Sequence, residues 1–302
     1  MHTGGEVSVD ENGDLKMTIA VTGATGQLGG LVIGELLERG VAPGDIVAVV
    51  RDEAKAADLA AKGVQVRVAA YEDPTALRTA FEGVDKLLLI SGSEVGRRVP
   101  QHTNVIEAAE ADGVKLIAYA SLLKADTSGI GLAPEHLATE QRLASSPIPA
   151  VFLRNGWYWE NYAQAIGQAA ATGTLIGAAG DGRVAGAARA DYAAAAAAVL
   201  TSEEGQGGRV YELGGDERLT YADLARIIGE VAGKTVEYKN LPEAEYAKVL
   251  ADNGVPEQFA AVLAGSDAGI ARGELDTESG DLQKLIGRSS TPFADVVKAA
   301  LA

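Results

Sequence analysis

The stretch TIAVTGATGQLGGLVIGELL, from Thr18 to Leu37, decides the fold of this chain. It starts with a short apolar run, continues through glycines at every third position (Gly23, Gly26 and Gly29), and ends in a helical pattern of apolar residues. A strand that passes through such a turn directly into a helix indicates a βαβ unit, which is the building block of parallel sheets.

Further apolar runs follow, each flanked by Gly, Asp or Pro and each succeeded by a helical pattern. This alternation predicts an α/β fold of Rossmann type, a doubly wound parallel sheet whose ligands lie at the carboxyl ends of the strands. We expect strands at 18–21, 46–50, 64–68, 86–90, 116–120, 150–153 and 209–213, and helices at 28–38, 53–62, 74–81, 101–111 and 190–201.

The composition excludes several classes of protein. With 302 residues, 47% apolar and 23% charged, the chain is long enough to bury a large core. The net charge is −16, and the Lys and Arg residues form no basic stripe along the sequence, so a nucleic-acid partner is not expected. The absence of Cys excludes disulfides and thiolate chemistry and is compatible with a cytoplasmic location. No apolar run reaches the roughly 20 residues of a membrane span.

The glycine-rich turn predicts a dinucleotide site. Its glycines let the turn tighten, let the backbone approach a pyrophosphate and let the helix pack closely on the sheet. The helix N-terminus adds about half a positive charge facing the anion. A tight turn that binds nothing is the alternative. The cofactor-binding residues expected here are Gly23, Ala24, Thr25, Gly26, Gln27 and Leu28.

The end of the second strand indicates which dinucleotide is bound. Arg51 stands twenty-two residues after Gly29, where an acidic residue would bind the adenosine ribose, and Lys55 lies one helical turn further. A guanidinium group matches a 2′-phosphate, so NADP(H) is favoured over NAD(H). Alternatively, Arg51 and Lys55 are solvated surface charges and Asp52 serves a bare ribose, so use of both cofactors stays open.

The fourth strand ends in a run of small residues, within LLLISGSEVGRR. Such a run lets a cofactor lie flat against the end of the strand, although an ordinary turn has the same composition. The residues expected to contact the cofactor here are Leu89, Ile90, Ser91, Gly92 and Ser93.

In TGATGQLG and in the strand that ends with YAS at Ser121, the chain resembles the short-chain dehydrogenases. Their usual Tyr-x-x-x-Lys pair is absent, because Tyr119 and Lys124 are five residues apart and do not share a helix face. Alignment on Glu140 places Leu132 and His136 at the tyrosine and lysine positions. Loss of a general acid typically costs roughly 10² to 10⁴ in rate, which disfavours reversible alcohol and ketone chemistry.

The remaining motifs resemble the atypical, NmrA-like branch of that family, and within it the bacterial type 2 NAD(P)H:quinone oxidoreductases. They are IVAVVRDEAKAADLAAKGV, KLLLISGSEVGRRVPQH, IAYASLLKADTS, FLRNGWYWENY, GAAGDGRVAGAARADYAAAA and KLIG. The resemblance implies two-electron reduction of a quinone by hydride from NADPH, without flavin or metal. A quinone accepts hydride readily because its product is aromatic, so a dedicated proton donor is dispensable and the site needs chiefly alignment and exclusion of water.

The resemblance also implies a location for the chemistry. Asn155 and Gly156 would contact the nicotinamide, and the quinone would be bound by Asn155, Trp157, Tyr158 and Glu160. Residues 177–191 would close over the cofactor, although their glycines are equally compatible with a flexible connection. The rings of WYWENY, Trp159 and Tyr162 above all, are equally compatible with core packing.

Three side chains are candidate proton donors, namely Tyr119, Ser121 and His136. For His136 a structural pair with Glu140, four residues on, is the favoured interpretation. Asp191 is expected to cap the N-terminus of a helix rather than to act in catalysis. The three His residues do not converge, so a metal site is not expected.

These patterns predict a division into domains. We expect 1–16 to be a disordered leader, 17–154 with 187–214 to form the NAD(P)-binding domain, and 155–186 with 215–302 to form a smaller substrate lobe. The protein is expected to be a monomer or a homodimer. Two other functions stay in view: an NmrA-like redox sensor that holds NADP(H) without turnover, and a reductase similar to isoflavone reductase or a sugar-nucleotide enzyme.

Overall fold

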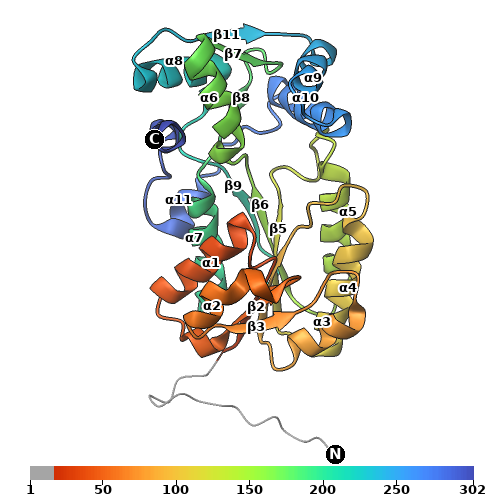
Figure 1. Cartoon of the computed structure of the whole chain (residues 1–302). Helices are drawn as coiled ribbons and strands as arrows, with labels where there is room; N and C mark the ends of the chain where they lie inside the picture. Colours follow the sequence, from red (N-terminus) through yellow and green to blue (C-terminus); the bar gives the residue numbers. More distant parts are fainter. Residues whose placement is uncertain (1–16) are drawn as a thin grey trace, which may run out of the picture.

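The computed structural model describes residues 17–302, and the expected leader lies outside them (Figure 1). Its main element is a seven-stranded sheet of order β3-β2-β1-β4-β5-β6-β9, in which every neighbouring pair is parallel. The strand order reverses between β1 and β4, so the sheet is doubly wound, and the predicted Rossmann-type fold is confirmed. The strands are β1 (Ile19–Thr22), β2 (Ile46–Val50), β3 (Gln65–Val68), β4 (Lys86–Ile90), β5 (Leu116–Leu122), β6 (Ala150–Asn155) and β9 (Val210–Leu213).

Helices cover both faces of this sheet (Figure 1). On one face α1 (Gln27–Glu38) packs against α7 (Arg189–Thr201), and α11 (Asp281–Ile286) packs against α7 and β9. On the other face α3 (Pro74–Phe81), α4 (Arg98–Ala111) and α5 (Ala133–Ala144) lie side by side. The short helices α2 (Ala57–Ala61), Pro43–Asp45 and Glu53–Ala56 belong to the connections.

The burial of alternate residues explains why the apolar runs form this sheet. In β1, Ile19 and Val21 contribute to the core under α1 and α7, whereas Ala20 contributes to the core under α3 and α4. A strand buried on both faces needs an unbroken apolar run. The runs in β1, β2, β4 and β5 therefore predict interior strands.

The ends of several elements differ from the sequence prediction. β5 and β6 each continue two residues beyond the apolar run, because Ser121 pairs with Arg154 and Leu122 with Asn155. α4 begins at Arg98 rather than 101, since Pro100 lies in the first turn of the helix, where a proline is tolerated.

The rest of the chain forms a second group of elements, drawn at the top of Figure 1. A separate buried cluster lies among its helices and includes Trp159, Tyr162, Tyr221 and Phe293. The boundaries of the substrate lobe, 155–186 with 215–302, stay a prediction. Within 215–302, α11 packs on the central sheet rather than on this second group of elements. The elements are the 3-10 helix Trp159–Tyr162, α6 (Ala163–Thr172), β7 (Thr174–Gly177), β8 (Arg183–Val184), β10 (Leu219–Thr220), α8 (Tyr221–Ala232), β11 (Glu237–Asn240), α9 (Glu243–Asp252), α10 (Glu257–Ala271) and α12 (Phe293–Leu301).

The glycine-rich turn brings α1 into direct backbone contact with the end of β1. Gly23 has a φ of +60°, a conformation that favours glycine. A Cβ atom at Gly29 would lie 2.4 Å from the carbonyl oxygen of Gly23 and 2.8 Å from Cα of Ala24. Only glycine at 29 allows this approach, which fixes where the N-terminus of α1 lies.

We expect Gly29→Ala to lower the free energy of unfolding by about 1–3 kcal/mol, because the added methyl group meets backbone that has no room to move. Gly34→Ala is the matched control in the same helix, since nothing lies within 4 Å of a Cβ there. That control should stabilise the protein by about 0.5–1 kcal/mol, the usual helix preference of Ala over Gly. Urea denaturation measures both, and equal effects of the two substitutions would contradict the steric argument.

Candidate functional site

A cleft of about 320 Å³ lies at the carboxyl edge of the sheet, where the strand order reverses. The β1–α1 turn and the ends of β2 and β4 form its walls. Among the predicted cofactor residues, those that line it are Gly23, Thr25, Gly26, Arg51, Lys55, Ile90, Ser91, Gly92 and Ser93. Ala24, Leu28 and Leu89 are buried in the core beside it. Gln27 is exposed at the start of α1.

The N-terminus of α1 has the features of an anion-binding site. Its N-cap residue is Gly26, which supplies no side-chain cap, and the first turn contains no acidic residue. The first amides of a helix have no partner within the helix. A Cβ at Gly26 would lie 3.0 Å from the carbonyl oxygen of Gly23. The open backbone and the helix dipole therefore fit a diphosphate.

Two cations lie at one end of the cleft. The Arg51 side chain is 74% exposed, and its guanidinium is 3.8 Å from the carboxylate of Glu94. Lys55 is exposed as well. The long, weak contact with Glu94 leaves the guanidinium able to turn toward a ligand phosphate.

Tyr71 is a cleft residue that the sequence reasoning missed. It follows β3, and its hydroxyl lies 2.6 Å from Oγ1 of Thr22 and 2.7 Å from the carbonyl oxygen of Ile90. Burial raises the pKa of the Tyr71 phenol. Its position at the carboxyl end of a strand could have identified it, since every such end faces the same edge of the sheet.

His102 and Arg98 of α4 hold the small-residue run after β4. The Gly92 amide donates to Nε2 of His102 at 2.9 Å, and Nε of Arg98 donates to the Gly92 carbonyl oxygen at 2.5 Å. Nδ1 of His102 lies 2.9 Å from the hydroxyl of Thr139. Because Nε2 accepts a hydrogen bond, the ring must be neutral. Burial, and then the charge of Arg98, lower the pKa of His102 to about 4.

Asn155 ends β6 with a side chain that is almost completely buried. Its Nδ2 donates to the Tyr158 hydroxyl at 3.1 Å, and its buried Oδ1 has no hydrogen-bond partner among the described residues. The Tyr158 ring meets Tyr192 edge to face, and the Arg189 guanidinium lies 5.1 Å from its centre. An unsatisfied buried oxygen at the carboxyl edge of the sheet fits a donor supplied by a ligand.

The other residues of the WYWENY segment point in different directions. Both carboxylate oxygens of Glu160 accept from the Arg189 amide, at 3.0 and 3.1 Å, so this side chain caps α7. Trp159 and Tyr162 are buried in the second cluster. Trp157 is half-buried and lines a second cavity, apart from the cleft.

The expectation that Asp191 caps α7 is wrong. Ala188 is the N-cap residue, and Glu160 satisfies the first amide of the helix. Asp191 lies in the first turn, completely buried, where it accepts hydrogen bonds from Arg288 and Thr291. Its role is to attach the C-terminal segment to α7.

The three candidate proton donors lie in closed hydrogen bonds. The Tyr119 hydroxyl is 2.8 Å from Nδ1 of His136, and the Ser121 hydroxyl donates to Glu140 at 2.6 Å. All three side chains are buried. Burial raises the pKa of Tyr119 and lowers that of His136 to about 3. A catalytic role for any of them stays a prediction.

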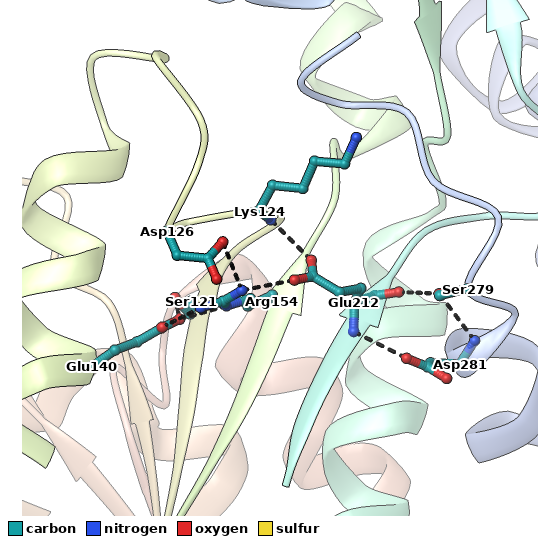
Figure 2. Close-up of polar contacts among 8 residues, drawn as sticks. All are labelled: Ser121, Lys124, Asp126, Glu140, Arg154, Glu212, Ser279 and Asp281. Atoms are coloured by element: carbon teal, nitrogen blue, oxygen red, sulfur yellow. Dashed lines mark hydrogen bonds and ion pairs between the residues drawn. The ribbon is translucent and has the colours of Figure 1, made fainter. Parts of the chain in front are cut away.

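The expected pair of His136 with Glu140 is wrong, because an arginine from the sheet occupies the carboxylate. Nε and one Nη of Arg154 donate to the two oxygens of Glu140 at 3.0 and 2.7 Å. The same guanidinium donates to Glu212 at 2.8 Å and lies 3.1 Å from Asp126 (Figure 2). These three carboxylates raise the pKa of Arg154.

This polar network crosses three strands. Ser121, Arg154 and Glu212 are register partners on β5, β6 and β9. Glu212 also accepts from the Lys124 amide at 2.9 Å. The main chain of Glu212 is bound by Ser279 and Asp281, as Figure 2 shows. The network therefore fixes the ends of these strands next to Asn155.

Residues 17–302 contain neither a metal-binding cluster nor a membrane-spanning helix. No three or more His, Asp or Glu side chains there are grouped so that they could hold a metal ion. Within the same range, none of the helices is long and apolar enough to cross a membrane.

A switch-point cleft with a glycine-rich turn and an uncapped helix defines an α/β protein of the dinucleotide-binding class. Comparison with known proteins identifies the family within this class. The family model described as "NmrA-like family" matches residues 15–281, so the chain belongs to the NmrA-like family.

Several relatives are similar along almost the whole chain. Quinone oxidoreductase 2 of Escherichia coli K12 is 55% identical over 279 residues, which cover 92% of this chain and 97% of that protein. The crystal structure of the NADPH-dependent quinone oxidoreductase of E. coli with NADPH has a TM-score of 0.92 at 53% identity, covering 94% of this chain and 100% of that one. Triphenylmethane reductase of Citrobacter sp. complexed with NADP(H) has a TM-score of 0.90 at 43% identity, with 94% and 100% coverage.

We expect His102→Gln to change how stability depends on pH. The folded-state pKa of His102 is lowered from 6.5 to about 4, so its contribution is complete above pH 6.5 and is lost as the pH falls toward 4. The difference in unfolding free energy between wild type and variant should therefore shrink by up to about 1.4 kcal/mol per pH unit in that window. Urea titrations at pH 7, 6 and 5 measure it, and a constant difference would contradict the buried neutral ring.

We expect Arg154→Met to lower the free energy of unfolding by about 3–5 kcal/mol, because Glu140 is then buried without a counter-charge. The double variant Arg154→Met/Glu140→Gln should recover a large part of this loss. Arg142→Met is the control: Arg142 binds Glu110 through two nitrogens, but the pair is about one quarter exposed. Arg142→Met should lower the free energy of unfolding by about 1 kcal/mol or less. Equal losses for Arg154→Met and Arg142→Met would contradict the argument.

Proposed function

We propose that this protein catalyses the two-electron reduction of quinones to hydroquinones by direct hydride transfer from NADPH, without flavin or metal. The observation that carries the proposal is the cleft itself, an uncapped helix N-terminus and open glycines with Arg51 and Lys55 at one end. The activity for which the E. coli relatives are named, NADPH-dependent quinone reduction, supports the choice of substrate.

Residues of the cleft, together with Asn155 at the end of β6 outside its lining, fit the dinucleotide part by part. The α1 amides suit the diphosphate, and the Arg51 fork suits a 2′-phosphate. The unpartnered Oδ1 of Asn155 suits a donor such as the carboxamide of nicotinamide. When bound, NADPH supplies the hydride. We therefore propose these residues, with Gly156, as the cofactor site, and NADPH as the preferred form.

The protein's own part in the reaction is to align the partners and exclude water. Tyr158 is held by Asn155 and by its contacts with Tyr192 and Arg189, so it offers a fixed ring against which a flat substrate can pack. Offset ring pairs contribute about 0.5–1.5 kcal/mol beyond burial. The hydroquinone oxygen takes its proton from water, which is consistent with the closed hydrogen bonds of Tyr119, Ser121 and His136.

The proposed function also bears on the cellular location and the oligomeric state of the protein. We infer a cytoplasmic location from the cysteine-free composition together with the need for NADPH. A monomer or a homodimer is compatible with this mechanism, because every proposed contact comes from one chain.

The test is oxidation of NADPH by the purified protein with a small benzoquinone or naphthoquinone, followed at the absorbance of the reduced nicotinamide. Saturable oxidation without added flavin, in protein that contains none, is the expected result. Tight binding of NADPH without oxidation by any of several quinones would instead favour the redox sensor.

We expect Arg51→Glu to raise the KM for NADPH by roughly 10- to 100-fold, because a charged hydrogen bond to phosphate is replaced by repulsion. The KM for NADH, which lacks this phosphate, should change much less. Arg78→Glu makes the same charge change on α3, beyond the cleft lining, and serves as the control. Equal effects of Arg51→Glu on both cofactors would remove the argument for NADPH.

A further inference from the structure

The end of the cleft that holds Arg51 and Lys55 also holds carboxylates. Glu72 and Glu94 are the acidic residues among the described residues that line the cleft. Arg51 follows β2 and Glu94 follows β4, and these strands lie on either side of β1, so the two side chains approach each other across the end of β1. Carboxylates repel a phosphate group, so the 2′-phosphate of NADPH does not explain why they are here.

The contact between Arg51 and Glu94 is loose. Oε1 of Glu94 lies 3.8 Å from Nη1 of Arg51, which is longer than a hydrogen bond. The side chains of Arg51 and Glu94 are 74% and 37% exposed, and exposed pairs of this kind contribute little to stability. Oε2 of Glu94 accepts from Nη1 of Arg97 at 2.8 Å. Arg97 therefore holds the Glu94 carboxylate in the cleft independently of Arg51.

Two other carboxylates near this end are used by the protein itself. Asp52, the alternative partner of a bare ribose, caps the short helix after β2, where its Oδ1 accepts from the Ala54 amide at 3.0 Å, and it does not line the cleft. Glu72 accepts from Nε2 of Gln101 at 2.6 Å, and this hydrogen bond lowers the pKa of Glu72. Glu94 is therefore the acidic residue of this end that is best placed for a ligand.

A bare ribose and a phosphorylated ribose need partners of opposite charge. The 2′-hydroxyl of NADH donates a hydrogen bond, and in dinucleotide-binding folds a carboxylate accepts it. The 2′-phosphate of NADPH accepts hydrogen bonds instead, and a guanidinium group matches it. Arg51 and Glu94 lie 3.8 Å apart, so one end of one cleft offers both partners.

We propose that Glu94 binds the ribose hydroxyls of NADH, so that the protein uses NADH as a second cofactor, and that the same carboxylate weakens the binding of NADPH by repelling its 2′-phosphate. The proposal rests on the proposed function, because it concerns the hydride donor of that reaction. With NADPH, Arg51 binds the phosphate and Glu94 stays with Arg97. With NADH, Glu94 accepts from the ribose and Arg51 stays in solvent. Glu94 therefore sets how strongly the protein prefers NADPH.

The binding test is isothermal titration calorimetry of the full chain with NADPH and with NADH. We expect Glu94→Gln, which removes the charge at nearly constant shape, to tighten NADPH binding and to weaken NADH binding, each by about three- to tenfold. A variant that folds poorly would lose affinity for both cofactors, so opposite changes assign the effect to recognition. 2′,5′-ADP and 5′-AMP, which differ from each other only in the 2′-phosphate, should show the same two changes.

Glu53→Gln is the matched control. Glu53 is exposed in the connection after β2 and does not line the cleft, so its substitution removes the same charge without touching the cofactor. It should change the Kd of either cofactor by less than about twofold, since salt screens a distant exposed charge. Glu94→Ala removes the acceptor atoms as well as the charge, and it should weaken NADH binding at least as much as Glu94→Gln.

Turnover separates this inference from the proposed function. With a benzoquinone, the wild-type protein should oxidise NADH as well as NADPH, with a higher KM for NADH. Glu94→Gln should raise the ratio of kcat/KM for NADPH to that for NADH by about tenfold or more.

Three results would overturn the inference and leave quinone reduction by NADPH standing. They are no binding of NADH to the wild-type protein, changes in the same direction for both cofactors in Glu94→Gln, and equal effects of Glu94→Gln and Glu53→Gln. Opposite changes in the two Kd values without quinone reduction by either cofactor would support the role of Glu94 and overturn the proposed function.

Discussion

The contact between Gly29 and the carbonyl oxygen of Gly23 is the constraint on which the site depends. No side chain fits between the two, so α1 begins directly at the edge of the sheet with its first amides facing the cleft. α7 packs against α1 with a run of buried alanines, Ala193–Ala197, which allow the two helices to approach closely. The geometry of the cleft thus follows from the smallest side chains in the chain.

Much of the fold could be predicted because its signals are local. The glycine spacing and the uninterrupted apolar runs indicate parallel strands buried on both faces, and the structure has these strands near the predicted positions. The ends of β5 and β6 could not be predicted in this way, because the pairing of Ser121 with Arg154 and of Leu122 with Asn155 depends on register rather than hydrophobicity. His102 was missed for a similar reason, since its contact with Gly92 joins a helix to a loop.

The polar core shows where reasoning within one helix fails. His136 and Glu140 have the spacing of a helical pair, but Glu140 binds Arg154 of β6, and His136 turns to Tyr119. A bidentate ion pair with a guanidinium is a stronger competitor for a carboxylate than a neutral imidazole. As a result, these hydroxyls and the imidazole join β5 to α5 through hydrogen bonds, which reasoning along one helix does not foresee.

The contacts of the Glu212 main chain affect the order in which the sheet is completed during synthesis. The main chain of this residue, on the edge strand β9, is bound by Ser279 and Asp281, which precede and begin α11 near the end of the chain. On the ribosome, β9 leaves the exit tunnel well before those partners are synthesised. The outer edge of the sheet therefore stays incomplete until Ser279 and Asp281 have been synthesised, so β9 cannot take its final contacts as soon as it leaves the ribosome.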